Sequence, residues 1–100
     1  MQSIKAAVKK GPVLAFLSAL NDVFKLYKAG IIREEDGCQG DDLDHIAVIV
    51  GWGRISRGLE YYIVKNSFGA TWGENGYFRI EITEGKGACG INQDIHYVNF

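Results

Sequence analysis

The stretch DHIAVIVGWG, from Asp44 to Gly53, is the clearest strand signal in the chain. It is rich in β-branched residues, and three segments of similar character follow it: LEYYIVKN (59–66), GYFRIEI (76–82) and IHYVNF (95–100). Glycine-bearing turns separate these segments, as is typical of consecutive strands. The pattern therefore predicts an antiparallel, barrel-like sheet.

The residues before this stretch predict one helix and a further strand. Ile4, Ala7 and Val8 recur at helical spacing, and Gly11-Pro12 ends the pattern, so a short N-terminal helix is expected over residues 2–10. The apolar run VLAFLSAL (13–20) fits a helix or a strand, and its position after Gly-Pro favours a strand. Residues 21–32 begin with a turn or helix-cap signal, and the acidic stretch 33–44 is expected to be a surface loop. The fold class predicted is α+β, mainly β.

Composition restricts the class of protein. A chain of 100 residues forms one domain at most, and its 47% hydrophobic and 23% charged residues are typical of a globular protein. A net charge of -1 provides no basic surface for nucleic acid or for an anionic membrane. The apolar stretches are too short for a transmembrane helix, and the first ten residues lack the apolar region of a signal peptide.

The cysteines and the two histidines are ambiguous when each is taken by itself. Cys38 and Cys89 allow one disulfide, which would stabilise the fold by roughly 4 kcal/mol, or two reduced thiols. His45 begins an apolar strand and has an ordinary structural explanation, as does His96 near the C-terminus. Asn66 ends a strand before a glycine-rich turn, where asparagine is common.

The order of the motifs is more specific than any single residue. The segments GPVLAFLSA, FKLYKAGII, GCQG, DHIAVIVGWG, YYIVKNSFGATWGENGYFRI and ACGI follow one another over nearly the whole chain. Together they resemble the C-terminal half, or right-hand domain, of the papain-like cysteine proteases, the family that includes the cathepsins. The resemblance implies that residues 1–100 are the β-rich domain of a peptidase whose N-terminal, cysteine-bearing domain is absent from this chain.

The resemblance assigns catalytic roles to two residues. His45 matches the histidine that takes the proton of the nucleophilic thiol and later donates it to the leaving amine. Asn66 matches the asparagine whose side-chain carbonyl accepts a hydrogen bond from that imidazole. The family's cysteine signature, C-G-[SA]-C-[WY], lies about 130 to 150 residues before these residues, and only 44 residues precede His45. The chain alone is therefore predicted to be inactive.

The resemblance also implies substrate contacts. Phe68 stands where the family most often has tryptophan, and Trp72 matches an aromatic near the histidine–asparagine contact. The specificity pocket, which takes the side chain two residues before the cut bond, matches Phe16, Leu43, Ile46 and Asp94, with Asp44 beside the histidine. Apolar walls favour Leu, Val or Phe in the substrate, and an acid at Asp94 favours arginine. The alternative, in which Asp94 is a solvated turn residue, stays open.

Other implied properties concern the cysteines, cofactors and partners. The resemblance implies a Cys38–Cys89 disulfide and no cofactor. A zinc site is the alternative, because each cysteine lies seven residues before a histidine, but this spacing is too long for typical zinc ligands. The expected partners are a peptide or protein substrate, the N-terminal protease domain and cystatin-like inhibitors, and the expected location is lysosomal, vacuolar or secreted.

Two function classes remain after these inferences. The first is hydrolysis of peptide bonds by the complete enzyme, with endopeptidase and exopeptidase activity both open. The second is a non-catalytic domain, either truncated or a pseudoprotease, that binds a partner or associates with itself. An upstream cysteine motif would favour the first class, and unrelated sequence upstream would favour the second.

Overall fold

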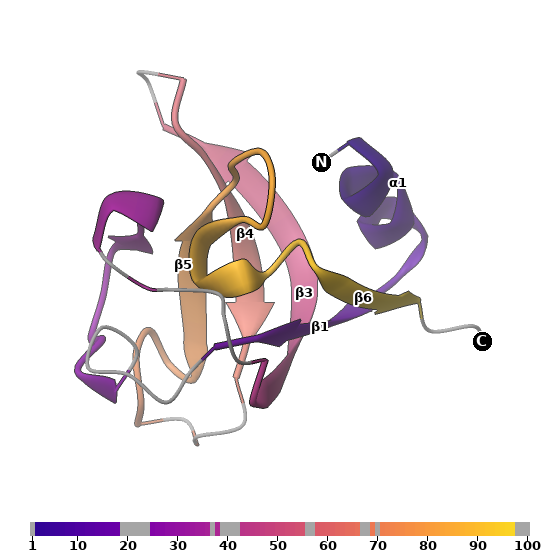
Figure 1. Ribbon diagram of the computed structural model, residues 1–100. Helices are drawn as coiled ribbons and strands as arrows, with labels where there is room; N and C mark the ends of the chain where they lie inside the picture. The colour runs from indigo at the N-terminus through magenta and orange to yellow at the C-terminus, as the bar shows by residue number, and fades with distance from the viewer. Residues whose placement is uncertain are drawn as a thin grey trace.

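A curved β-sheet organises the protein, as the computed structural model in Figure 1 shows. The structure describes residues 2–18, 25–36, 38, 43–55, 58–66, 69 and 71–97. Within these residues, the elements in chain order are α1 (Gln2–Lys10), β1 (Val13–Leu17), β2 (Ile31–Ile32), the 3₁₀ turn η1 (Glu34–Asp36), β3 (His45–Arg54), β4 (Glu60–Lys65), β5 (Tyr77–Glu81), the 3₁₀ turn η2 (Ala88–Gly90) and β6 (Asp94–Tyr97). The short N-terminal helix and the mainly β, α+β fold are confirmed.

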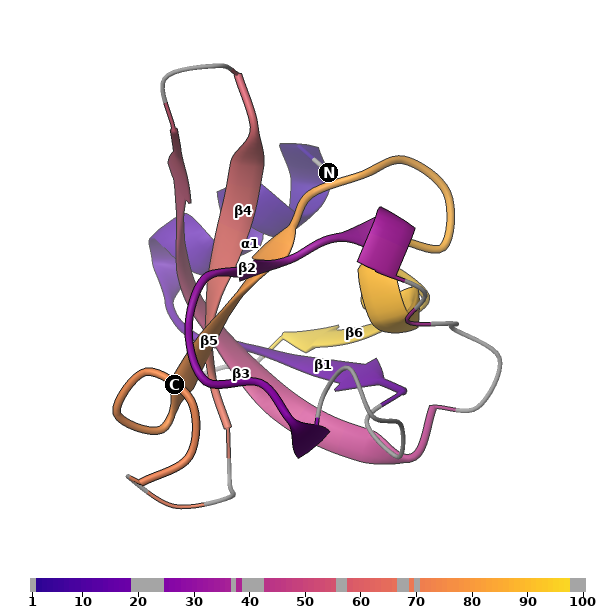
Figure 2. The same ribbon diagram turned by 90° about the vertical axis from the view of Figure 1, so that its left-hand side faces the viewer.

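The strands form one sheet in the order β2-β5-β4-β3-β1-β6. The β2–β5 pair is parallel, and the other neighbouring strands run antiparallel. Figure 2 shows the sheet curving around the core, with η1 and η2 on its open side. The sheet is thus curved like part of a barrel but does not close, because its outer strands β2 and β6 are not paired with each other.

The core lies on the concave face of the sheet and follows the alternation of side chains along each strand. Every second residue of β1 is buried, and the same alternation continues in the inner strands. The buried residues of this face are Val13, Ala15, Leu17, Ala47, Ile49, Tyr62, Val64, Phe78 and Ile80. The opposite face keeps partly exposed side chains, among them Ile46, which is 46% exposed.

Helix α1 packs at the end of β3 that is farthest from His45. Ile4 and Val8, one turn apart, are buried in the core cluster. The Lys5 ammonium lies 2.7 Å from the Glu60 carboxylate, and Glu60 pairs with Arg54, the last residue of β3. Among the described residues, no helix has the length and apolar character needed to span a bilayer.

The disulfide between Cys38 and Cys89 is present, with a Cα–Cα distance of 4.7 Å and a sequence separation of 51. The Cys89 carbonyl accepts a hydrogen bond of 2.8 Å from the Ser18 N–H, directly after β1. Ser18 follows Leu17, which is the register partner of His45. The hydrogen bond from Ser18 to Cys89 therefore attaches the disulfide to the end of the sheet where His45 lies. Both sulfur atoms are in this bond, so the zinc alternative, which needed them as thiolates, is wrong.

Candidate active site

His45 and Asn66 meet at one end of the β3–β4 pair. The two strands run antiparallel with Val48 opposite Lys65, so the first residue of β3 comes close to the residue that follows β4. The His45 Nε2 atom lies 2.5 Å from the Asn66 Oδ1 atom. Since a carbonyl oxygen only accepts, Nε2 carries the hydrogen, and Nδ1 is then the basic nitrogen of the neutral ring. The contact therefore fixes both the tautomer and the orientation of the imidazole.

The Asn66 side of this contact is held by the turn that follows it. Asn66 is 6% exposed, and its backbone N–H donates to the Gly76 carbonyl at 2.9 Å. The Gly76 N–H in turn donates to the Trp72 carbonyl at 2.8 Å. Gly76 has a φ of 90°, a backbone conformation that glycine adopts without steric cost. The glycine-rich stretch TWGENG thus forms a fixed turn against the end of β4.

Aromatic packing supports the same turn. The Trp72 ring lies 5.3 Å from the Tyr27 ring and 5.7 Å from the Phe78 ring, measured between centroids. The Tyr27 hydroxyl donates to the Gly30 carbonyl at 2.6 Å, and burial raises the pKa of Tyr27 to about 12. Trp72 therefore anchors the turn to the 25–30 segment through its ring contacts.

An ion pair completes the support and was not anticipated from the sequence. The Glu74 carboxylate accepts from Arg79 Nε at 3.0 Å and from Arg79 Nη2 at 2.8 Å, and also from the Gly30 N–H at 3.2 Å. The hydrogen bond from Arg79 lowers the pKa of Glu74, and the same contact raises the pKa of Arg79. The only hint of this pair in the sequence is that Glu74 and Arg79 have opposite charges and lie five residues apart, on either side of a glycine. Charge alone did not reveal it, because the pairing depends on how the turn folds.

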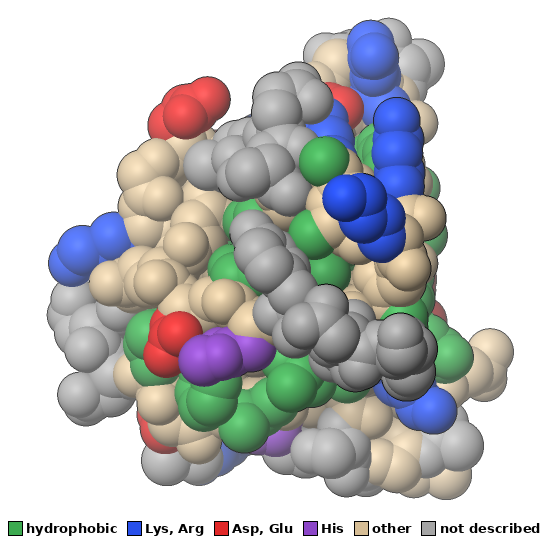
Figure 3. Space-filling model, turned by 90° about the vertical axis from the view of Figure 1, so that its right-hand side faces the viewer, with side chains coloured by type: hydrophobic (Ala, Val, Ile, Leu, Met, Phe, Trp, Pro, Cys, Tyr) green, Lys and Arg blue, Asp and Glu red, His purple; other side chains and the backbone are tan. Residues whose placement is uncertain are grey.

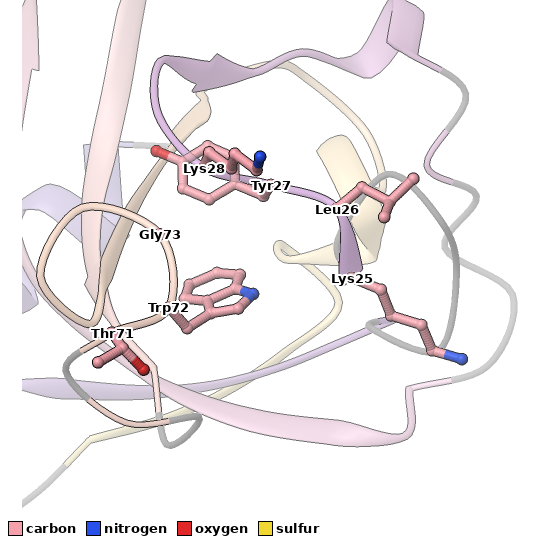
Figure 4. A pocket seen from close by; sticks show the side chains of 7 residues that line it. All are labelled: Lys25, Leu26, Tyr27, Lys28, Thr71, Trp72 and Gly73. Carbon is pink, nitrogen blue, oxygen red and sulfur yellow. The ribbon is translucent and has the colours of Figure 1, made fainter.

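A hollow of about 460 Å³ lies beside this turn. Its lining residues are Lys25, Leu26, Tyr27, Lys28, Thr71, Trp72 and Gly73. Figure 4 shows Trp72 below Tyr27, with Leu26 and Lys25 to one side. The lining of the hollow combines aromatic, aliphatic and basic side chains, and its Leu26 is 74% exposed. Trp72, which the sequence assigned to substrate contacts, lies in its wall.

The predicted specificity residues form a second group on the exposed face of the sheet. Phe16 in β1 is the register partner of Ile46 in β3 on one side and of Asp94 in β6 on the other. These three residues therefore make one row across adjacent strands. Leu43 is half-buried and Asp44 is exposed, both directly before β3. Phe68 lies outside the described residues.

Asp94 has a partner that the sequence did not indicate. It is the first residue of β6, and its Oδ1 atom lies 2.8 Å from Nε2 of His96. The His96 ring meets the Phe16 ring at 5.3 Å in an edge-on arrangement. Figure 3 shows this side of the molecule, where histidine and acidic side chains lie against a continuous area of apolar ones. Asp94 and His96 are two residues apart on β6, so the alternation of side chains along the strand brings them to the same face.

Comparison with known proteins identifies the family. The sequence model described as "Papain family cysteine protease" matches residues 1–99. This chain belongs to the papain family of cysteine proteases. A senescence-specific cysteine protease of rice (Oryza sativa) is 38% identical over 97 residues, and cathepsin L of Sarcophaga peregrina is 39% identical over 87 residues.

The papain-family relatives are longer than this chain. The matched region covers 95% of the chain and 28% of the rice protease, and 87% of the chain and 25% of the cathepsin L. The structure of the bromelain protease of Ananas comosus in complex with the E64 inhibitor superposes with a TM-score of 0.85 at 40% identity. It covers 96% of this chain and 44% of the bromelain chain. The chain thus has the fold of the right-hand, C-terminal domain of papain-family proteases.

Proposed function

We propose that this chain carries the histidine and asparagine of a papain-family peptidase active site, and that the nucleophilic cysteine comes from a separate N-terminal domain. The hydrogen bond of 2.5 Å between His45 Nε2 and Asn66 Oδ1 carries this proposal. It leaves His45 Nδ1 as the base for a thiol, which must lose its proton to become a nucleophile. Protonated His45 then donates to the leaving amine.

The cysteines of this chain support a nucleophile from outside it. Cys38 and Cys89 are 5% and 0% exposed and are bonded to each other, so neither is available as a thiolate. Disulfides persist in oxidising compartments. Together with the relatives, this supports a lysosomal or vacuolar location, or secretion, and peptide substrates together with cystatin-like inhibitors as partners.

The row formed by Phe16, Ile46 and Asp94 supports a subsite for the side chain two residues before the cut bond. Phe16 and Ile46 provide apolar surface for Leu, Val or Phe, and the Asp94 carboxylate provides a partner for arginine. Leu43, Asp44, Phe68 and Trp72 complete the proposed substrate contacts.

A hybrid enzyme tests the catalytic role directly. Residues 1–99 would replace the matching part of bromelain, behind its cysteine-bearing half, and would be assayed on fluorogenic peptides and with E64. The 100-residue chain alone should show no turnover, whereas the hybrid should cleave peptides and bind E64. His45→Ala should abolish cleavage, and Glu35→Gln, a change at an exposed carboxylate of η1, should have no effect. A folded hybrid in which His45→Ala keeps full activity would refute the proposal.

The alternative function is a non-catalytic domain that binds a partner or a second copy. Ile46 and Val50 of β3 favour it, because they are 46% and 41% exposed on the face that carries the proposed subsite. A hybrid that folds but neither cleaves peptides nor binds E64, together with tight association of the 100-residue chain, would favour this alternative over peptidase function.

A further inference from the structure

We propose that His96 sets the charge of the subsite formed by Phe16, Ile46 and Asp94. With neutral His96, the subsite accepts a cationic side chain such as arginine; with protonated His96, it prefers an uncharged apolar side chain. The inference deepens the proposed peptidase function and rests on it for the substrate. Both members of the ion pair on which it depends, Asp94 and His96, lie in this chain.

The side chains of Phe16, Asp94 and His96 lie on one surface of the sheet. The Asp94 carboxylate is 2.8 Å from His96 Nε2, and the His96 ring rests edge-on against Phe16 with 5.3 Å between centroids. Phe16 lies between Ile46 and Asp94 in the sheet register. A substrate side chain that contacts Phe16 and Ile46 therefore ends next to the Asp94–His96 pair.

The strands beside this pair supply the other ionisable groups near the subsite. Strand β1 is the neighbour of β6 in the sheet, and its sequence VLAFL contains no ionisable side chain. The turn η2 packs against β1, and its sequence ACG contains none either, because Cys89 is in the disulfide. Within β6 itself, Asp94 and His96 are the residues whose side chains carry or gain a charge near neutral pH. At the start of β3, one strand further, Asp44 and His45 directly precede Ile46, and alternation brings Asp44 to the face of Ile46, whereas Arg54 lies at the far end of β3. Asp94 and His96 are thus the charged pair on the β6 side of Phe16, and the His96→Asn variant separates their contribution from that of Asp44 and His45.

The chemistry follows from the charge of the imidazole. Histidine side chains gain and lose a proton between about pH 5 and 8, and carboxylates are ionised throughout that range. The pair thus has a net charge of about -1 with neutral imidazole and about zero with imidazolium. Both side chains are about half exposed, 49% for Asp94 and 54% for His96, so an entering side chain can reach the pair. Raising the pH consequently restores the attraction for a cationic substrate.

In this proposal His96 does not react with the substrate and acts through Asp94, whose negative charge it offsets when it is protonated. The substrate selectivity of the hybrid enzyme tests this role. We would measure kcat/KM for matched peptides with arginine or leucine two residues before the cut bond, from about pH 5 to about pH 7.5. The arginine-to-leucine ratio should rise roughly fivefold with pH, and His96→Asn, which cannot gain charge, should keep a high, pH-independent ratio. Asp94→Asn should lower the ratio at every pH, because the carboxylate that attracts arginine is lost. Glu35→Gln, an equal loss of charge on η1, should follow the unmodified enzyme. A ratio with the same pH dependence in His96→Asn would overturn the proposal.

A second measurement separates this inference from the peptidase proposal. In the 100-residue chain, the carbon NMR signal of the Asp94 carboxyl group would be followed over the same pH range. It should show a step that coincides with protonation of His96 and that disappears in His96→Asn. The absence of such a step in the unmodified chain would refute the coupling regardless of activity. An inactive hybrid combined with a clear step would instead count against peptidase function and leave the charge coupling supported.

Discussion

His45 and Asn66 are 21 residues apart in the sequence and are joined by one hydrogen bond of 2.5 Å between Nε2 and Oδ1. Asn66 is buried at the end of β4, whereas His45 is half-buried at the start of β3. The asparagine is thus the fixed partner, and the imidazole takes its orientation from it. Loss of the asparagine side chain should therefore remove the group that orients the imidazole.

Substitution of Asn66 by alanine should lower kcat of the hybrid enzyme by about 10²-fold, because the imidazole loses its fixed orientation. Peptide cleavage under saturating substrate would measure this loss. The matched control is Asn75→Gly, since Asn75 is exposed and has a φ of 58° that glycine adopts readily. Equal kcat for Asn66→Ala and the control would contradict a role for Asn66 in orientation.

Reduction of the Cys38–Cys89 bond should lower the free energy of unfolding by about 4 kcal/mol, on the basis of the loop it closes. Mass spectrometry after alkylation, with and without reductant, would count the free thiols, and thermal melts would report the stability. The Cys38→Ala/Cys89→Ala double variant should melt like the reduced protein. Two thiols that alkylate without reductant in the folded chain would show that the bond is not formed.

The buried tyrosines Tyr27 and Tyr62 should respond differently to loss of the hydroxyl group. Among the described residues, the Tyr62 hydroxyl has no hydrogen-bond partner although the residue is fully buried, whereas Tyr27 donates to Gly30. Tyr62→Phe should therefore be neutral or stabilising, and Tyr27→Phe should cost about 1 kcal/mol. Denaturant unfolding of both variants measures the difference. A larger loss for Tyr62→Phe would mean that its hydroxyl is satisfied.

The Glu74–Arg79 pair should make part of the stability dependent on acid pH. Because the pKa of Glu74 is lowered in the folded state, its contribution is present above the ordinary value of 4.5 and is lost as the pH falls through the lowered value. Unfolding measured from about pH 6 to pH 3 should thus show a smaller decrease in stability for Glu74→Gln than for the unmodified chain. Glu84→Gln, at an exposed position, is the control and should behave like the unmodified chain. Parallel curves for all three proteins would exclude this contribution.

The isolated chain should associate with itself through the exposed apolar face of β3. Burial of Val50 and Ile46 stabilises such a contact, so Val50→Lys should weaken it by about tenfold. Ile55→Lys is a matched control, because Ile55 is also 41% exposed but lies beyond the end of β3. Light scattering over a concentration series would measure the mass. A monomer at high micromolar concentration would exclude self-association.

Local sequence patterns determined most of the elements of this fold. Ile4, Ala7 and Val8 at helical spacing predicted α1, and the β-branched and aromatic runs predicted β3 to β6. The apolar run of β1 fitted a helix or a strand, and its position after Gly-Pro favoured the strand. These predictions succeeded because helix and strand periodicities are properties of adjacent residues. The ordered motifs also indicated the family and the Cys38–Cys89 bond, since a long series of motifs is specific where a single residue is not.

Tertiary structure alone decided the remaining features. Strand β2 has two residues, too few for a periodic signal, and the sheet stays open because its outer strands remain unpaired. The contacts of Glu74 with Arg79 and of Asp94 with His96 depend on a turn conformation and on how a strand alternates within the sheet. The family resemblance had already grouped Ile46, Phe16 and Asp94, but their alignment in one row requires the register of three strands that are distant in sequence. Sequence spacing does not contain that register, because it is set by which side chains pack together across the sheet.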